Sequence, residues 1–281
     1  MTETAIVGFI LIILNIAFSY KGFTNAIFFD GYKFDVDRIL INKDYKRLVT
    51  AGFLHVSWMH LIFNMLSLYA FSKLIETNLG EFKLLIIYCT ALIGGNLLAL
   101  FVHKNHGGYT AVGASGAVCG IIFASIALFP DMGIGFFGLP FSIPSWLYGI
   151  IYIAFSIYGI KSGKDNIGHE AHLGGALIGM VVALLLVPSA LADNYITILI
   201  IAVPTIAFIY LLITKPQILF VDALFNKTPL NKYSIDHKYN ADTTKNQKEI
   251  DKILDKISLK GMDSLSKNEK DKLKKYSEKV H

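Results

Sequence analysis

The chain has 281 residues, of which 54% are hydrophobic and only 17% are charged, whereas an average soluble domain carries about 25% charged residues. This composition excludes an ordinary soluble domain. The net charge of +5 arises in the tail, because residues 215–281 hold 15 Lys against 10 Asp+Glu, while residues 1–214 hold 11 basic and 11 acidic residues. The even balance in the first part argues against a nucleic-acid-binding surface.

Seven apolar blocks follow one another along residues 1–214, each close to the roughly 20 residues that a membrane-spanning helix needs. The blocks cover Ala5–Tyr20, Val56–Leu74, Leu84–Val102, Ala114–Phe129, Trp146–Ile160, Ala171–Leu191 and Tyr195–Ile213. The first block has neither a basic n-region nor a small-residue cleavage site, so we expect a helix rather than a cleaved signal peptide. The sequence therefore predicts an all-α, multi-pass membrane protein that lies in the lipid bilayer.

The connections between the blocks are short, apart from the segment from Lys21 to Gly52. That segment mixes aromatic residues with charges, which is typical of chain at the lipid–water interface. After residue 215 the chain becomes polar. We expect a six-helix membrane core at 1–192, a seventh transmembrane helix at 193–214, a linker at 215–248 and a small soluble helical hairpin at 249–281. In the hairpin, Ser266 and Glu269 fit an S-x-x-E capping box, with Leu265 at the position of the staple residue.

Polar groups inside a bilayer are costly and are usually paired or functional, so the polar residues of the blocks are the candidates for chemistry. The first cluster, Gly113-Ala114-Ser115-Gly116, opens the fourth block. Glycines beside a serine permit a sharp turn and the close approach of a substrate, and a helix start leaves backbone N–H groups free to bind an oxyanion. Taken alone, the motif is more simply explained as a helix start with Ser115 as N-cap.

Two further clusters contain a candidate general base and a pair of candidate hydrogen-bond donors. Ala171-His172-Leu173-Gly174-Gly175 opens the sixth block, and histidine is the usual base for a serine at neutral pH. Its alternative role is a hydrogen bond to a helix-end carbonyl or to water. In the second block, His60 and Asn64 lie four residues apart and so on one helix face. Two donors there suit a developing oxyanion, or an interhelical hydrogen-bond pair.

Small residues link the serine and histidine clusters. Gly116 and Gly120 form a G-x-x-x-G pattern on the fourth helix, and Gly175 and Gly179 form another on the sixth. Because glycine lets two helix backbones approach closely, we expect these helices to pack together. That packing would bring the serine within hydrogen-bond reach of the histidine.

On these residues the chain resembles the rhomboid family of intramembrane serine proteases, over roughly residues 45–190. The resemblance rests on His55-Val56-Ser57-Trp58-Met59-His60-Leu61-Ile62-Phe63-Asn64, Gly113-Ala114-Ser115-Gly116 and Ala171-His172-Leu173-Gly174-Gly175, in this order. It implies a six-helix core with a water-filled cavity opening to one face, and a Ser115–His172 dyad without an acidic third member. It also implies that His60, Asn64 and the backbone N–H of Ser115 bind the oxyanion. We group Gly113 with these oxyanion- and substrate-binding residues.

The predicted function is therefore that of an intramembrane serine endopeptidase that needs neither a cofactor nor a metal. His172 would remove the proton of Ser115, which attacks a peptide carbonyl. By resemblance, the substrate is another protein's transmembrane segment, cut near the membrane surface, and the protein is expected in a bacterial inner membrane. Segments that unwind easily and hold small residues should be cut best, because a helix must open to offer a peptide bond.

The sequence departs from the family pattern behind the histidine. Some rhomboids carry an aromatic residue one turn after the serine, stacked on the catalytic histidine, but here Cys119 stands at that position. His169 lies one turn before His172 and is a rival base, and we prefer His172 because it matches the motif. Arg47, preceded by Lys46, matches the basic residue of the family's tryptophan–arginine pair in the first loop.

The same residues bear on other mechanisms and functions. A zinc protease needs H-E-x-x-H, and His169-Glu170-Ala171-His172 is one residue short. Asp131, Asp165 and Asp193 fall at block ends, which argues against paired membrane aspartates, and Cys89 and Cys119 indicate packing. A rhomboid-like pseudoprotease would bind transmembrane clients without cleaving them, but such proteins typically lack the serine or the histidine. A transporter predicts internal repeats, and we detect none that is convincing.

Charge distribution and family resemblance disagree about topology. With seven helices, the first loop, which has six Lys and Arg residues, shares a side with the Lys-rich tail. The positive-inside rule then places the active-site face in the cytoplasm. Rhomboids usually open their site to the outside, and a count of six helices would move the tail across the membrane.

Overall fold

The computed structural model describes residues 6–135, 142–162 and 167–215, and, in the tail, residues 253, 256, 257, 264–266, 268–270 and 272. The chain divides into two compact units, Met1–Lys227 and Thr228–His281. Each unit is described by itself.

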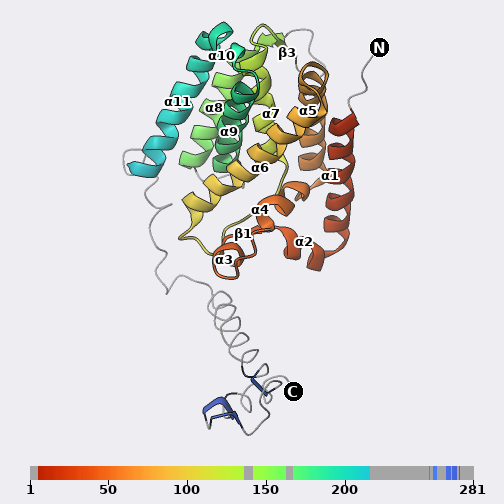
Figure 1. Cartoon of the computed structure of the whole chain (residues 1–281), viewed down its shortest axis with the longest axis vertical. Helices are drawn as coiled ribbons and strands as arrows, with labels where there is room; N and C mark the ends of the chain where they lie inside the picture. Colours follow the sequence, from red (N-terminus) through yellow and green to blue (C-terminus); the bar gives the residue numbers. More distant parts are fainter. Residues whose placement is uncertain are drawn as a thin grey trace. The chain divides into compact units, whose positions relative to one another are not determined.

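The described part of the first unit contains seven long helices, joined by shorter elements (Figure 1). They are α1 (Ile6–Thr24), α5 (Trp58–Leu79), α6 (Glu81–His103), α7 (Ser115–Leu128), α8 (Ser145–Ser162), α9 (His169–Leu186) and α11 (Tyr195–Thr214). Each one corresponds to one of the predicted apolar blocks. Successive long helices run in opposite directions (Figure 1).

Most predicted block ends differ from the helix ends by a few residues, and the two largest differences are at the ends of the second and sixth blocks. The sixth block was expected to continue to Leu191, but α9 ends at Leu186 and a separate short helix, α10 (Ser189–Asp193), follows Pro188. Proline lacks a backbone N–H and so interrupts the helical hydrogen bonds. The second block is longer than expected, because α5 runs on to Leu79 and ends at Gly80, whose φ of 90° suits glycine.

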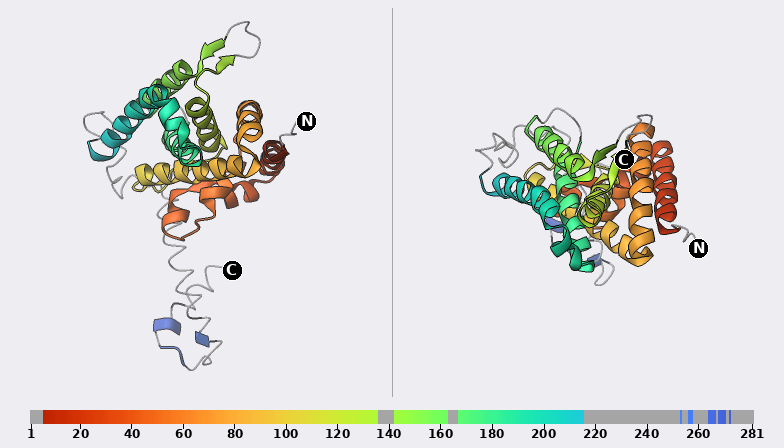
Figure 2. Two further views of the ribbon diagram at one scale, coloured as in Figure 1. Left: turned by 45° about the horizontal axis from the view of Figure 1, so that its top comes forward. Right: turned by 90° about the horizontal axis from the view of Figure 1, so that it is seen from above.

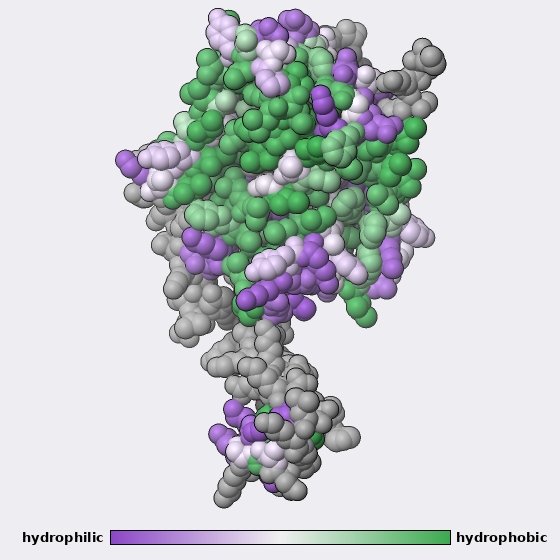
Figure 3. Space-filling model, viewed as in Figure 1, coloured by the Kyte–Doolittle hydropathy of each residue, from purple (hydrophilic) through white to green (hydrophobic). Residues whose placement is uncertain are grey.

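The first unit is a multi-pass membrane protein by the length and composition of its helices. Among the described residues, α1, α6, α9 and α11 are long and apolar enough to cross a membrane, and a fifth span results if the bent pair Arg47–Phe53 and Trp58–Leu79 is counted as one. Large hydrophobic side chains are exposed on the outer faces of these helices. Figure 3 shows them as a broad hydrophobic region between two more polar ends. The predicted all-α membrane fold is confirmed.

The long connection after α1 is an ordered, folded segment. It contains α2 (Ala26–Tyr32), β1 (Phe34–Asp35), α3 (Val36–Leu40), α4 (Arg47–Thr50) and the 3₁₀ turn η1 (Ala51–Phe53). Arg47 is only 2% exposed, and its guanidinium donates to the Asp44 carboxylate at 2.8 Å and to the carbonyls of Asp30 and Lys33 at 3.0 and 2.6 Å. The Asn96 amide on α6 donates to the Leu48 carbonyl at 2.8 Å. The Arg47 bonds hold the segment itself together, and the Asn96 bond ties it to α6.

The same connection reaches the serine motif through a short antiparallel pairing. Strand β1 pairs with β2 (Thr110–Ala111), with Phe34 opposite Ala111 and Asp35 opposite Thr110. The second strand ends four residues before Ser115. At the other end of the unit, β3 (Gly133–Gly135) pairs with β4 (Ser142–Pro144).

The core of the unit is formed by α6, α7 and α9, which make its most extensive helix contacts (Figure 2). All residues from Gly116 to Ala127 of α7 are buried, so α7 is surrounded by its neighbours. Polar side chains tie the outer helices to one another and to this core. Glu76 on α5, only 4% exposed, accepts from the N–H groups of Val7 and Gly8 at the start of α1, at 2.7 and 2.9 Å. Asn194 donates to the Ala127 carbonyl near the end of α7 at 2.9 Å.

In the tail unit, the structure bears out the predicted capping box. The backbone N–H of Ser266 donates to the Glu269 carboxylate at 2.7 Å, and the Ser266 hydroxyl accepts from the Glu269 N–H at 3.3 Å. Leu265 is buried with Ile253, and Ile257 packs against both. The predicted linker at 215–248, apart from Lys215, lies outside the described residues, and the predicted division into domains stays a prediction.

Candidate active site

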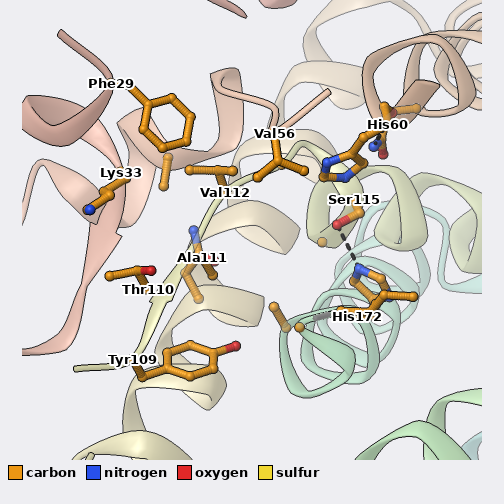
Figure 4. Close-up of a pocket in the computed structure, with 18 of the residues that line it drawn as sticks. Phe29, Lys33, Val56, His60, Tyr109, Thr110, Ala111, Val112, Ser115 and His172 are labelled. Carbon is orange, nitrogen blue, oxygen red and sulfur yellow. Dashed lines mark hydrogen bonds between the residues drawn. The ribbon is translucent and has the colours of Figure 1, made fainter. Parts of the chain in front are cut away.

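Ser115 and His172 meet at the N-terminal ends of α7 and α9. The Ser115 Oγ lies 2.6 Å from His172 Nε2, and Figure 4 shows the two side chains pointing toward each other across the gap between their helices. The distance is that of a short hydrogen bond. Ser115 is the first residue of α7, where the backbone N–H groups have no acceptor within the helix.

Glycines bring the two helices close enough for this contact. A Cβ built on Gly175 would collide with the backbone of Gly116, and one built on Gly179 would collide with the backbone of Gly120. The two backbones therefore touch along one seam, as the paired G-x-x-x-G patterns predict. Ser115 lies at one end of this seam and His172 faces it.

Gly113 determines the geometry just before the serine. Its φ is 135°, in the region that L side chains rarely adopt, and its N–H donates to the Ala51 carbonyl at 3.0 Å. Its N–H is thus already used within the protein. A Cβ added there would lie 3.0 Å from His60 Nε2 and 3.5 Å from the Ser115 Oγ. Gly113 therefore provides the space in which the His60 ring approaches Ser115.

His60 and Asn64 both line the cavity in front of Ser115. His60 presents Nε2 toward Gly113, and Figure 4 shows its ring beside Ser115. The Asn64 amide donates to the His60 carbonyl at 3.0 Å, and an amide nitrogen carries two hydrogens, so one donor remains. The structure brings together all five residues that the sequence singled out for the site.

His55 belongs to the first of the family motifs, but no role for it follows from the sequence. It is fully buried, its Nδ1 lies 2.8 Å from the Ser19 hydroxyl of α1, and its Nε2 accepts from the Ala114 N–H at 3.5 Å. The Ser19 hydroxyl also donates to the Phe53 carbonyl at 3.0 Å. A hydroxyl has one hydrogen to donate, so Ser19 accepts from Nδ1–H of His55. This leaves Nε2 as the acceptor that holds the loop before Ser115.

The rival base His169 lies on another side of α9. It is 1% exposed, its ring packs against Phe155 of α8 with centroids 5.2 Å apart, and a Cβ on Gly159 would collide with it. His172, in contrast, lines the cavity. The geometry favours His172 as the base.

Tyr152 of α8 supports the histidine, and the sequence did not reveal it. Its hydroxyl lies 3.0 Å from His172 Nδ1 and 2.9 Å from the Cys119 Sγ. The histidine therefore has a partner behind it although Cys119 replaces the aromatic residue of some rhomboids, because the contact comes from another helix. Its only signal in the sequence is a tyrosine hydroxyl inside an apolar block.

The site opens into a cavity of about 820 Å³. Its walls come from the first connection, α5, α6, the segment around β2, and the N-terminal ends of α7 and α9. Figure 4 shows Phe29 and Lys33 on the far side of this cavity from Ser115. The volume suffices for several residues of an extended peptide.

Comparisons with known proteins place this arrangement in a family. A profile described as the rhomboid domain matches residues 42–189, which is more than half of the chain and includes every residue of the candidate site. The chain belongs to the rhomboid family. A second profile, a family of unknown function (DUF6576), matches residues 233–279 in the tail.

Several named rhomboid proteins are similar to the chain. The RHOMBOID-like protein 12, mitochondrial, of Arabidopsis thaliana is 34% identical over 151 residues, 48% of this chain and 44% of that protein. The rhomboid protease AarA of Providencia stuartii is 32% identical over 191 residues, 60% of this chain and 65% of that protein. Rhomboid protein 1, mitochondrial, of Saccharomyces cerevisiae is 29% identical over 51% of this chain and 43% of that protein. The chain spans about half the length of most of the curated relatives it matches.

Proposed function

We propose that this rhomboid is an intramembrane serine endopeptidase that cleaves transmembrane segments of other proteins. The observation that carries the proposal is the 2.6 Å contact between the Ser115 Oγ and His172 Nε2. It lies in a cavity that also holds His60 and Asn64. A nucleophile in contact with a base, facing candidate oxyanion donors, is the arrangement that acyl transfer needs.

The proposed reaction has two steps. His172 Nε2 takes the Ser115 hydroxyl proton while Oγ bonds to the substrate carbonyl carbon, and the oxyanion accepts from Asn64, His60 and the Ser115 N–H. His172 then gives the proton to the leaving amine as the C–N bond breaks. In the second step water attacks the acyl-enzyme with His172 again as base, and Ser115 regains its proton.

The substrate side of the proposal rests on the surroundings of the cavity. The cavity is lined in part by α5 and α6, whose outer faces carry exposed apolar side chains, and the proposal is that a segment lying in the bilayer would reach it from there. Helices with weak hydrogen bonding and small residues should be cut best, since they unwind at lower cost. A bacterial inner membrane is the proposed location, on the match to the Providencia stuartii protein.

A fluorophosphonate probe tests the proposal directly. We expect the purified protein in detergent to be labelled, the label to map to Ser115, and both labelling and cleavage of a reporter transmembrane segment to vanish in Ser115→Ala. His172→Ala should lose at least about 10³-fold in cleavage rate. A correctly folded protein that takes no label and cuts no segment would instead be a pseudoprotease that only binds its clients.

A further inference from the structure

A chain of hydrogen bonds extends beyond the serine and the histidine. The Ser115 Oγ lies 2.6 Å from His172 Nε2, His172 Nδ1 lies 3.0 Å from the Tyr152 hydroxyl, and that hydroxyl lies 2.9 Å from the Cys119 Sγ. Cys119 is 3% exposed and follows Ser115 by one turn of α7. The chain thus starts and ends on the same helix and passes through α9 and α8.

The direction of these bonds follows from the role of the base. To accept the Ser115 proton, His172 must hold a lone pair on Nε2 and so carry its hydrogen on Nδ1. That hydrogen then points at the Tyr152 oxygen. Tyr152 must accept it, and its own hydrogen is free to go to the sulfur of Cys119, which is a weak acceptor.

The reverse direction would disable the base. If the Tyr152 hydroxyl donated to Nδ1, the imidazole hydrogen would sit on Nε2 and point at the Ser115 oxygen. His172 would then be a donor where the reaction needs an acceptor. Whether Tyr152 accepts or donates therefore depends on whether Cys119 takes its hydrogen.

We propose that Tyr152 and Cys119 are positioning residues for His172: Cys119 accepts from the Tyr152 hydroxyl, so that Tyr152 accepts from Nδ1–H and keeps Nε2 free to take the serine proton. This proposal rests on the proposed function. It adds a third and a fourth member to a site for which the family resemblance implied only a dyad.

Packing holds the tyrosine ring in the orientation that the chain needs. Tyr148, one turn earlier on α8, stacks on Tyr152 with centroids 6.1 Å apart and an angle of 26°. Phe123 of α7 meets the same ring edge-on, at 5.9 Å and 68°. With the ring packed against these two neighbours, the freedom left to Tyr152 is the rotation of its hydroxyl hydrogen between His172 and Cys119.

Kinetics of single and double variants test this assignment. The variants are Tyr152→Phe, Cys119→Ala and the two combined, measured on a reporter transmembrane segment in proteoliposomes. Tyr152→Phe should lower kcat about three- to tenfold at unchanged KM, as expected for one lost neutral hydrogen bond to the reacting base. Cys119→Ala should lower kcat at least as much, because Tyr152 then donates to Nδ1. The double variant should be no slower than Cys119→Ala, since it lacks the Tyr152 hydroxyl that would donate to Nδ1.

Matched controls separate this role from packing. Tyr158→Phe removes a hydroxyl from the same helix at a side chain that is 70% exposed, and Cys89→Ala removes an exposed thiol; both should keep the wild-type kcat. Cys119→Ser retains an acceptor and should stay at least about threefold faster than Cys119→Ala. Thermal unfolding of each variant is measured in parallel.

The outcomes are distinguishable from a failure of the proposed function. Cleavage that survives Ser115→Ala sinks the protease assignment and this inference with it. If Ser115→Ala is inactive but both single variants match the wild type, only the positioning role is wrong. The positioning role is also wrong if the loss of kcat in the double variant equals the product of the losses in the two single variants. It is wrong as well if Cys119→Ser is no faster than Cys119→Ala.

Discussion

Gly113 controls the distance between His60 and Ser115. Its φ of 135° is one that other residues adopt only with strain, at a cost of about 1–3 kcal/mol. A Cβ would also lie 2.8 Å from the His60 Cε1, closer than van der Waals contact allows. A larger residue at this position must therefore move either the loop or the histidine.

Gly113→Ala is accordingly expected to slow cleavage by about tenfold or more, because about 1–3 kcal/mol of strain falls on the loop that carries the nucleophile. The initial rate on a reporter transmembrane segment measures the effect. Gly31→Ala is the matched control, since nothing lies within 4 Å of a Cβ there. A Gly113→Ala protein that cuts at the wild-type rate would show that His60 and the loop tolerate displacement.

Among the elements, the seam between α7 and α9 is the contact on which the site depends. Backbone meets backbone there at Gly116, Gly120, Gly175 and Gly179. Packing of this kind depends on the absence of side chains, because small residues are what let membrane helices approach closely. The position of Ser115 relative to His172 follows from the separation of the two helices.

Gly179→Ala should separate the two helices two turns away from the histidine. We expect it to destabilise the protein by about 1–3 kcal/mol, the usual effect of overpacking, and to lower the rate of fluorophosphonate labelling as well. Thermal unfolding in detergent and the labelling rate measure these effects. Gly135→Ala, where a Cβ meets nothing within 4 Å, serves as control. If neither the thermal unfolding nor the labelling rate changes in Gly179→Ala, the contact between α7 and α9 does not determine the position of Ser115 relative to His172.

The cap in the tail depends on one carboxylate. Hydrogen bonds from Lys256 and from Ser266 lower the pKa of Glu269 to about 2. A carboxyl whose pKa is lower in the folded state stabilises that state above its unfolded pKa of about 4.3, and this contribution is lost as the pH falls toward 2. The cap should therefore weaken between about pH 4.5 and pH 2.

Hydrogen exchange of the tail in the full chain checks this pH dependence. Glu269→Gln keeps a capping-box residue but loses the charge. The protection of its tail amides against hydrogen exchange should therefore be lower than in the wild type and independent of pH in this range. Glu269→Ala should be the least protected. Equal protection of all three proteins at pH 6 would mean that the cap does not stabilise the helix start.

At the scale of the whole membrane unit, the alternation of helix direction determines which ends share a side. In Figure 1, α1 runs toward the end of the unit that carries α2–α4, and α11 runs in the same direction as α1. If all seven long helices cross the bilayer, the start of the tail and the active-site face lie on the same side. A count of six crossings would separate them.

Topology mapping decides between the two counts. In a Cys89→Ser background, the variant Asn42→Cys in the first connection should react with a membrane-impermeant thiol reagent added to one side of the membrane. A reporter fused after His281 should be detected on that same side. Asn42 is exposed, and Cys119 is buried. Opposite sides for the two signals would rule out seven crossings.

The sequence by itself determined the features that depend on local pattern. Apolar blocks specify membrane helices because a helix satisfies its backbone hydrogen bonds within its own segment, and the paired glycines on the fourth and sixth blocks predicted that these helices touch. The motifs on the blocks were enough to group Ser115, His172, His60, Asn64 and Gly113 into one candidate site. The S-x-x-E pattern in the tail predicted its cap for a similar reason, since its partners are three residues apart.

Only the tertiary structure decided which groups surround the histidine. His169 and His172 lie on adjacent faces of one helical turn, and the rotation of α9 turns the first toward α8 and the second toward Ser115. Tyr152 reaches Nδ1 of His172 because α8 packs beside α9, and His55 is held toward the loop before Ser115 because α1 supplies Ser19. These contacts join residues 20 to 59 positions apart, and no periodicity within one segment encodes the position of another helix.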